Sequence, residues 1–415
     1  MRVATFRARG LVLSEHEFEL PVDHERPDGS SLTVFAREVV ARRRERDELP
    51  WLVFFQGGPG FEAARPFKPS SPSWLERALE DYRVLLLDQR GTGRSMPVGV
   101  LDGMSAQEQA GYLMHFRADG IVRDAELIRA ELGIDKWCVL GQSFGGFCVT
   151  RYLSASPESL AEAFITGGLP PLEAHPDDIY RATYRRTLDR NRAYYERYPE
   201  DRERVRGIVE RLDADDVRLP SGDRLTSRRF RALGNMLGMS DGFERLHYIV
   251  ELPVGSPAFL HDVEGVATLA FARNPIYAVL HEACYGQGFA TRWSAERVLP
   301  NEFREDTTLF TGEHIYPWMF EDFGALRPLR EAADVLAEHV WPDLYDVKRL
   351  AVNDVPVAAA IYSNDPYVER AYSEQSATAI RGVRIWVTSE YDHDGLRADG
   401  SRVLGRLIDL LRGDV

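Results

Sequence analysis

The architecture of this chain can be read from residues 137–146, Trp137-Cys138-Val139-Leu140-Gly141-Gln142-Ser143-Phe144-Gly145-Gly146. The apolar run Trp137–Leu140 predicts a strand buried on both faces, and a helical pattern follows from Phe144 through Ser154. Gly141-x-Ser143-x-Gly145 therefore lies at a sharp turn from strand to helix, where glycines avoid collisions and the hydroxyl is exposed. This context predicts Ser143 as a nucleophile; the alternative is a plain Gly-Ser turn in another doubly wound protein.

Apolar and helical segments alternate on both sides of this motif. Alternation of this kind predicts a mainly parallel sheet, and the first two strand patterns predict an antiparallel pair ahead of it. The segments predicted as strands are Val3–Leu20, Ser31–Val40, Trp51–Phe55, Tyr82–Leu87, Trp137–Leu140, Leu160–Thr166, Val355–Tyr362 and Val383–Thr388.

The alternation stops after Gly167-Gly168-Leu169-Pro170-Pro171 and resumes near Val355. The sequence pattern of the intervening segment predicts helices and loops, beginning with a long, charged helical stretch over Asp177–Leu212. We therefore predict an α/β-hydrolase fold, with a mainly parallel sheet and helices on both of its faces. Its core comprises residues 1–171 and 341–415, and a helical cap domain is inserted over residues 172–340.

The composition narrows the class of protein. Of 415 residues, 44% are hydrophobic, which allows a sizeable core, and a formal net charge of -14 disfavours a nucleic-acid partner. Because no apolar run could span a bilayer and the N-terminus lacks the apolar region of a signal peptide, we expect a soluble cytoplasmic protein. The three cysteines, Cys138, Cys148 and Cys284, have neither the number of a disulfide framework nor the spacing of a zinc site, so we expect no metal.

Two residues late in the chain are candidates to activate Ser143. In α/β-hydrolases the nucleophile is followed along the chain by an acid and then by a histidine. His393 follows the last predicted strand and Asp365 follows the strand before it, where the functional groups of an open α/β sheet collect. We predict that His393 is the general base and that Asp365 orients it. Asp392 and Asp394 are rival candidates for the acid.

The negative charge that develops on the attacked carbonyl oxygen requires two hydrogen-bond donors. One candidate is the backbone N–H of Phe144, directly after the predicted nucleophile. The loop after Trp51–Phe55 is rich in glycine, and its Gly58 is the second candidate because a glycine backbone can approach a substrate closely.

Three motifs together carry a family resemblance. They are Gln56-Gly57-Gly58-Pro59-Gly60, Asp88-Gln89-Arg90-Gly91-Thr92-Gly93-Arg94-Ser95 and Gly141-Gln142-Ser143-Phe144-Gly145-Gly146. With these motifs the chain resembles the prolyl aminopeptidases, also called proline iminopeptidases, although that family often has His where this chain has Gln56. The resemblance implies a serine exopeptidase that releases N-terminal proline from small peptides through an acyl-enzyme, without a metal or organic cofactor.

An exopeptidase must bind the free α-ammonium group of its substrate, and a carboxylate in a partly closed pocket does this well. The resemblance implies that this carboxylate comes from the cap. We predict Glu282 for this role, with Tyr277 and Tyr285 packing on the pyrrolidine ring and Glu244 as a weaker candidate. Another hydrolase of this core, such as an esterase, a lactonase or a broader aminopeptidase, remains an alternative, as does a non-catalytic binding protein.

Overall fold

A computed structural model describes residues 2–267 and 271–415 of the chain, and its centre is a nine-stranded sheet in the order β1-β2-β3-β5-β4-β6-β7-β8-β9. The strands are β1 (Arg2–Ala8), β2 (Leu11–Pro21), β3 (Ser31–Ala41), β4 (Trp51–Phe55), β5 (Arg83–Leu87), β6 (Trp137–Gln142), β7 (Leu160–Thr166), β8 (Val357–Tyr362) and β9 (Val383–Thr388). The six strands from β5 to β9 in this order pair in parallel, and β1, β2 and β3 extend the sheet in antiparallel pairing. The mainly parallel sheet predicted from the sequence is therefore confirmed.

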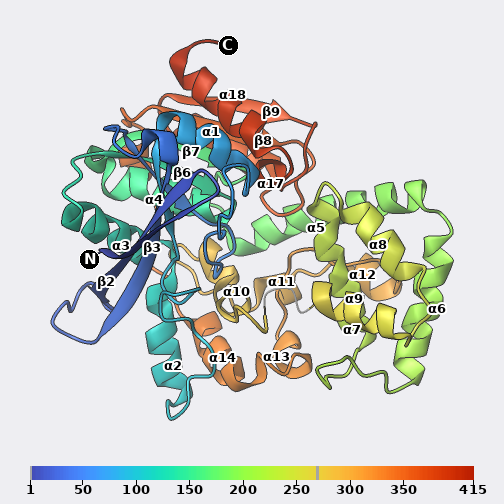
Figure 1. The fold of residues 1–415 in the computed structure, drawn as a ribbon. Helices are drawn as coiled ribbons and strands as arrows, with labels where there is room; N and C mark the ends of the chain where they lie inside the picture. Colours follow the sequence, from blue (N-terminus) through green and yellow to red (C-terminus); the bar gives the residue numbers. More distant parts are fainter. Residues whose placement is uncertain (1, 268–270) are drawn as a thin grey trace.

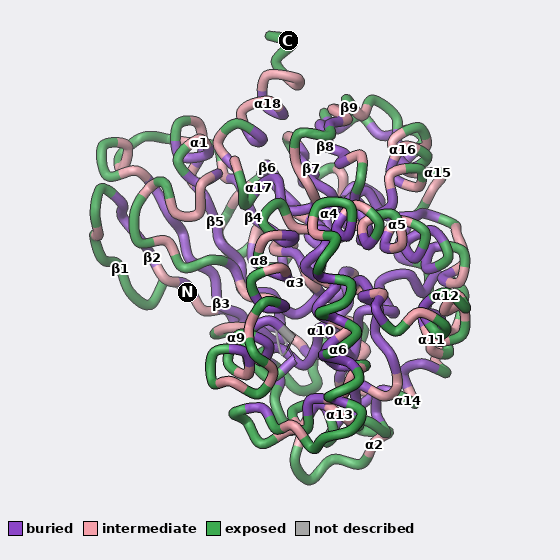
Figure 2. The backbone as a smooth tube through the Cα atoms, turned by 90° about the vertical axis from the view of Figure 1, so that its right-hand side faces the viewer, coloured by how far each residue is buried: buried purple, intermediate pink, exposed green. Residues whose placement is uncertain are grey.

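The first strand pattern behaves differently from its prediction. Val3–Leu20 forms two strands instead of one, because Arg9 and Gly10 adopt positive φ angles of 45° and 88° and turn the chain into a hairpin. Strand β1 is exposed along almost its whole length, and Figure 2 shows it at the outer edge of the sheet, away from the buried central strands.

Helices cover both faces of the sheet (Figure 1). The helices α1 (Ser73–Asp81), α17 (Gly395–Ala398) and α18 (Gly400–Arg412) share one apolar core with the strands. On the other face lie α3 (Ala118–Glu131), α4 (Phe144–Ala155) and α16 (Arg370–Ala379). This layering is that of an α/β-hydrolase core, in which both faces of a parallel sheet are buried.

The helical stretch between β5 and β6 is interrupted. It comprises α2 (Ala106–Leu113), η2 (Met114–Phe116) and α3, with an extended backbone at Arg117 (φ -76°, ψ 176°). The Arg117 side chain is buried and donates hydrogen bonds to the carbonyl oxygens of Gly286 (2.8 Å) and Pro342 (2.9 Å). The break therefore lets this arginine join the core to the segment between β7 and β8.

That segment between β7 and β8 consists largely of helices, seen to the right of and below the sheet in Figure 1. They are α5 (Pro176–Arg197), α6 (Asp201–Ala214), α7 (Ser227–Arg231), η4 (Ala232–Gly238), α8 (Gly242–Val250), α9 (Pro257–Ala267), α10 (Ile276–Leu280), η5 (Glu282–Tyr285), α11 (Ser294–Arg297), α12 (Asn301–Glu305), α13 (Met319–Asp322), η6 (Arg327–Leu329), α14 (Arg330–Glu338) and α15 (Val347–Leu350). The short 3-10 helices η1 (Arg42–Arg44) and η3 (Pro157–Ser159) lie outside it.

The helices α5 to α9 pack around an apolar core of their own. The predicted single helix over Asp177–Leu212 is two helices, α5 and α6, because Pro199 cannot continue a helix and disfavours the helical backbone of Tyr198 before it. Among the described residues, no helix combines the length and the apolar character needed to cross a membrane.

Candidate active site

Ser143 lies at the turn between β6 and α4 with a strained backbone, φ 56° and ψ -124°. Holding a serine there costs about 1–3 kcal/mol, which the surrounding packing must offset. A Cβ atom on Gly145 would come within 1.9 Å of the carbonyl oxygen of Phe55, and one on Gly141 within 2.2 Å of the oxygen of Gly145. The two glycines of the motif are therefore required by close backbone approach, as the sequence pattern predicts.

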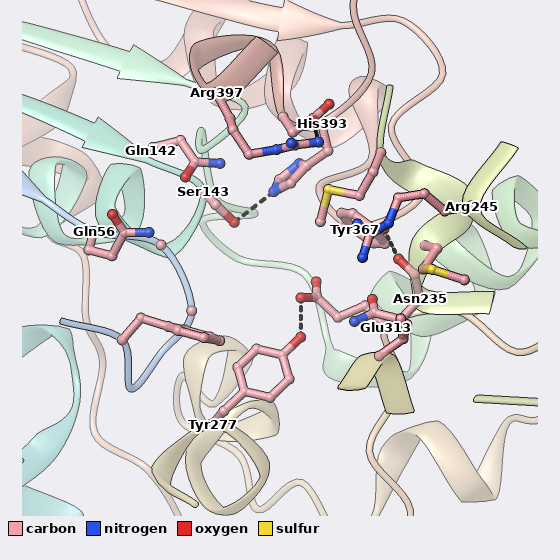
Figure 3. Close-up of a pocket in the computed structure, with 17 residues that line it drawn as sticks. Gln56, Gln142, Ser143, Asn235, Arg245, Tyr277, Glu313, Tyr367, His393 and Arg397 are labelled. Atoms are coloured by element: carbon pink, nitrogen blue, oxygen red, sulfur yellow. Dashed lines mark hydrogen bonds and ion pairs between the residues drawn. The ribbon is translucent and has the colours of Figure 1, made fainter. Parts of the chain in front are cut away.

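Three side chains form a continuous hydrogen-bonded chain beside this turn (Figure 3 shows two of them). The Ser143 Oγ lies 2.8 Å from His393 Nε2, and His393 Nδ1 lies 2.6 Å from Asp365 Oδ2. The second carboxylate oxygen of Asp365 accepts the backbone N–H groups of Tyr367 (2.8 Å) and Val368 (3.1 Å). Because the carboxylate holds the proton on Nδ1, Nε2 is free to accept the proton of the serine hydroxyl.

The electrostatic surroundings favour a protonated His393. Burial of the ring opposes its charge, but the surrounding carboxylates together outweigh burial, chiefly through the negative charge and hydrogen bond of Asp365, so the pKa of His393 is raised above its ordinary value. Glu313 and Asp394 act in the same direction. The imidazolium that forms when a base accepts a proton is thus stabilised at this position.

The loop that carries His393 is joined to the helices inserted after β7. The backbone N–H of His393 donates to the carbonyl oxygen of Gly238 at 3.0 Å. Arg190 of α5 donates both to Asp392, at 2.9 Å, and to the carbonyl oxygen of Leu237, at 2.7 Å. The helical insertion therefore helps to fix the position of the histidine.

The glycine-rich loop after β4 lies on another side of Ser143. A Cβ atom on Gly57 would lie 3.1 Å from both the carbonyl oxygen of Gln142 and the Cβ of Ser143, so the loop packs closely against the turn that carries the serine. The loop is held by Gln89, whose side-chain amide donates to the carbonyl oxygen of Gln56 at 2.9 Å. Gly58 has a φ of 136°, a conformation that glycine adopts readily, and Phe144 begins α4 immediately after the serine.

A cavity of about 240 Å³ opens onto Ser143 and His393 (Figure 3). Both the core and the helical insertion line it. The lining residues are Gln56, Gly57, Gly58, Phe61, Gln142, Ser143, Asn235, Met236, Met239, Arg245, Val266, Tyr277, Glu313, Tyr367, His393, Asp394 and Arg397.

Glu313 is the glutamate that faces this cavity. Its side chain is 17% exposed, accepts a hydrogen bond from the Tyr277 hydroxyl and lies 3.6 Å from His281 Nε2. Burial raises the pKa of a carboxyl group, but the hydrogen bond and charge of His281, the charge of His393 and the hydrogen bond of Tyr277 reverse this effect and lower the pKa of Glu313. The cavity therefore contains an ionised carboxylate near the serine, which can bind a cation.

Glu282, which the sequence predicts to bind the substrate ammonium group, lies outside the lining of this cavity. Its carboxylate is buried and accepts the backbone N–H groups of Ser294 (3.1 Å) and Ala295 (2.8 Å). Burial raises its pKa, although these hydrogen bonds oppose the shift. Glu282 therefore does not lie at the cavity that opens onto Ser143. Its carboxylate instead stabilises the start of α11.

Of the other residues predicted to bind the substrate, Tyr277 lies at the cavity, whereas Tyr285 and Glu244 lie outside its lining. Tyr277 lines the cavity, with its ring edge-on to Phe61 at 5.5 Å between centroids. Tyr285 is buried outside the cavity lining and packs against the ring of Phe147 at 5.8 Å. Glu244 pairs with an arginine of α5 and does not line the cavity either.

Sequence reasoning missed Glu313, Asn235 and Arg245, which all line the cavity. Glu313 lies in the loop Thr311-Gly312-Glu313-His314, between helices α12 and α13. No strand lies directly before it in the described part of the insertion, so the rule that places functional groups at strand ends did not apply. Glutamates are frequent in this insertion, and their sequence positions alone do not show which one faces the serine.

Comparison with known proteins agrees with this geometry. Residues 50–272 match the family described as alpha/beta hydrolase fold, and the chain belongs to the α/β-hydrolases. It is 47% identical over 418 residues to a proline iminopeptidase of Aeromonas sobria, with 97% of both chains covered. It is 36% identical over 421 residues to a proline iminopeptidase of Aspergillus aculeatus, with 96% of this chain and 93% of the relative covered. Within the α/β-hydrolases, the chain therefore belongs to the proline iminopeptidase family.

Proposed function

We propose that the protein is a prolyl aminopeptidase, a serine exopeptidase that releases N-terminal proline from small peptides. The observation that carries the proposal is one cavity that joins the Ser143–His393 pair to the ionised carboxylate of Glu313. Near-full-length identity to two proline iminopeptidases supports the same substrate class. An exopeptidase needs this combination, because its nucleophile must act at a fixed distance from a positively charged chain end.

Glu313 takes the role that the sequence alone assigned to Glu282. The α-ammonium group of an N-terminal proline carries two N–H donors, and a carboxylate is a strong acceptor for both. The rings of Tyr277 and Phe61 line the same cavity and supply apolar surface for the pyrrolidine ring. The Tyr277 hydroxyl and His281 keep the carboxylate oriented and ionised while the site is empty.

Acylation follows from the hydrogen-bonded chain at Ser143. His393 Nε2 takes the hydroxyl proton as Oγ bonds to the prolyl carbonyl carbon, and Asp365 stabilises the imidazolium. The carbonyl oxygen becomes an oxyanion, which the backbone N–H groups of Gly58 and Phe144 receive. The C–N bond then breaks, the proton passes from His393 to the leaving amine, and a prolyl ester remains on the serine oxygen.

Deacylation repeats these proton transfers with water. His393 takes a proton from a water molecule, whose oxygen attacks the ester carbonyl. The second oxyanion collapses, Ser143 Oγ regains its proton from His393, and proline leaves as the free amino acid. Each group returns to its starting state, so the cycle requires no co-reactant besides water.

We also place this activity in the cytoplasm. All three cysteines, Cys138, Cys148 and Cys284, are buried free thiols, which fits a reducing compartment. Assay of prolyl aminopeptidase activity in fractionated source cells tests this assignment. Activity confined to the secreted fraction would contradict it.

A turnover profile over N-terminal residues tests the proposed function. The substrates are aminoacyl-methylcoumarylamides of proline, alanine, leucine and glutamate, together with an acetate ester, and Ser143→Ala is the control. We expect the highest kcat/KM for the prolyl substrate and loss of that activity in the variant. Efficient cleavage of the ester with no prolyl turnover would instead favour the esterase alternative.

A further inference from the structure

Arg245, in the first turn of α8, contributes a positive charge to the active-site cavity. Its side chain is exposed, and no hydrogen bond or ion pair to it is found in the described part of the chain. In Figure 3 this side chain points into the cavity, opposite the loop of Gln56. A guanidinium group in this position is available to a ligand.

The carboxylates nearest to Arg245 along the chain are already engaged. Glu244 pairs with Arg197 of α5. Asp241 pairs with Arg397 at 2.8 Å, and Arg397 also pairs with Asp394. Of these two arginines of the cavity lining, Arg397 is therefore neutralised by protein carboxylates, whereas no carboxylate in the described parts of the chain pairs with Arg245.

The chemistry of the proposed reaction places the leaving group on this side of the cavity. His393 gives its proton to the leaving amine, so the rest of the peptide must extend past the imidazole and away from the oxyanion donors. Figure 3 shows Arg397 and Arg245 on the His393 side of Ser143, with Gln56 on the opposite side. A leaving group that has just passed His393 thus meets the unpaired guanidinium.

We propose that Arg245 binds a carboxylate of the leaving group, and that the preferred substrates are short peptides with a carboxylate close to the scissile bond. This inference rests on the proposed function and specifies its substrate class. Glu313 and Arg245 together give the cavity a negative and a positive site, which matches a zwitterionic dipeptide. The carboxylate is either the C-terminus of a dipeptide or an acidic side chain next to the proline, because guanidinium binds both.

Three peptides, two variants of Arg245 and one control variant test the proposal. The peptides are prolyl-glycine, its C-terminal amide and the α-amide of prolyl-aspartic acid, and free proline is measured as the product. The quantity of interest is kcat/KM for each carboxylate peptide divided by kcat/KM for the glycine amide. Comparing this ratio between wild type and variant cancels differences in the reactivity of the leaving amines.

We expect Arg245→Met to lower the ratio by about fivefold, the value for an exposed ion pair worth about 1 kcal/mol. Arg245→Glu should lower it further, and added salt should lower it in the wild type but not in Arg245→Met. A fall for prolyl-glycine only identifies the C-terminus as the ligand, and a fall for the aspartyl peptide only identifies the side chain. The matched control is Arg192→Met, an exposed arginine of α5 outside the cavity lining, which should keep the wild-type ratio.

Equal ratios in the wild type and in both Arg245 variants would overturn the proposal. The same conclusion holds if Arg192→Met lowers the ratio as much as Arg245→Met does, because the effect would then come from the overall charge of the cap. Failure of the wild type to cleave any prolyl substrate, including the methylcoumarylamide, is a distinct result that removes the proposed function and this inference with it.

Discussion

Replacement of Glu313 by glutamine removes one negative charge from the cavity and leaves the side chain almost the same size. The amide oxygen can still accept the Tyr277 hydroxyl, so the local packing should persist. A hydrogen bond to a charged partner contributes about 1.5–3 kcal/mol. Because Glu313 is only 17% exposed and its pKa is lowered, the loss should lie near the upper end, about 2–3 kcal/mol. This corresponds to a fall in kcat/KM of about 30- to 150-fold.

The assay is steady-state hydrolysis of prolyl-methylcoumarylamide, with kcat and KM determined separately. Most of the loss should appear in KM, since the ammonium group is bound in both the ground state and the transition state. The p-nitrophenyl ester of N-acetylproline lacks the ammonium group, and its hydrolysis should be much less affected.

Glu282→Gln is the matched control, because Glu282 is a second buried glutamate of the same insertion outside this cavity. It should keep the wild-type KM, although loss of its carboxylate at α11 can lower the melting temperature. If Glu313→Gln loses equal activity on the free-amine and blocked substrates, Glu313 does not bind the ammonium group. A large rise of KM in Glu282→Gln alone would return that role to Glu282.

Three further predictions follow from the geometry at Ser143. On acidification kcat/KM should fall with a midpoint above the ordinary imidazole pKa of about 6.5, because His393 must be neutral to act as a base and its pKa is raised. A midpoint below that value would count against His393 as the base. Asp365→Asn should lower kcat by about 10³- to 10⁴-fold while the protein stays folded by circular dichroism, and near-normal turnover would remove Asp365 from the mechanism. Gly145→Ala should destabilise the protein by at least about 3 kcal/mol, seen as a large fall in melting temperature, because the new Cβ meets a carbonyl oxygen at 1.9 Å. Gly207→Ala is its control: that helical glycine has no atom within 4 Å of the added Cβ, so alanine should stabilise by about 0.5–1 kcal/mol, and equal destabilisation of the two variants would contradict the packing argument.

The sheet could be predicted from sequence because its strands are short apolar runs between recognisable turns. The strands β4 to β9 follow the predicted segments closely, and the largest error concerns the hairpin at Arg9 and Gly10. That error has a physical reason, since alternation continues through the turn and the left-handed backbone at Arg9 has no signal in the sequence. The break at Arg117 likewise has no local signal in the sequence, because its cause is a set of carbonyl oxygens far away along the chain.

Positions in the site differ in how far the sequence determines them. Ser143, Asp365 and His393 could be selected because parallel strands end at the same edge of the sheet and bring their following loops together. The helical insertion obeys no such rule, so nothing in the sequence indicates that Glu313 faces the cavity while Glu282 stabilises α11. Arg245 is equally inconspicuous in a chain rich in arginine. Only the three-dimensional structure shows that it lines the cavity at Ser143 without a charged partner among the described residues.

Covalent labelling with a fluorophosphonate, mapped by peptide mass spectrometry, is the most direct examination of whether the hydroxyl at position 143 is chemically activated by the imidazole at 393. A single adduct on the peptide that contains Ser143, formed rapidly by the wild type and far more slowly by His393→Ala, is the predicted result. An unlabelled wild-type protein, an adduct on a different serine, or labelling at the same rate without the imidazole would contradict the account.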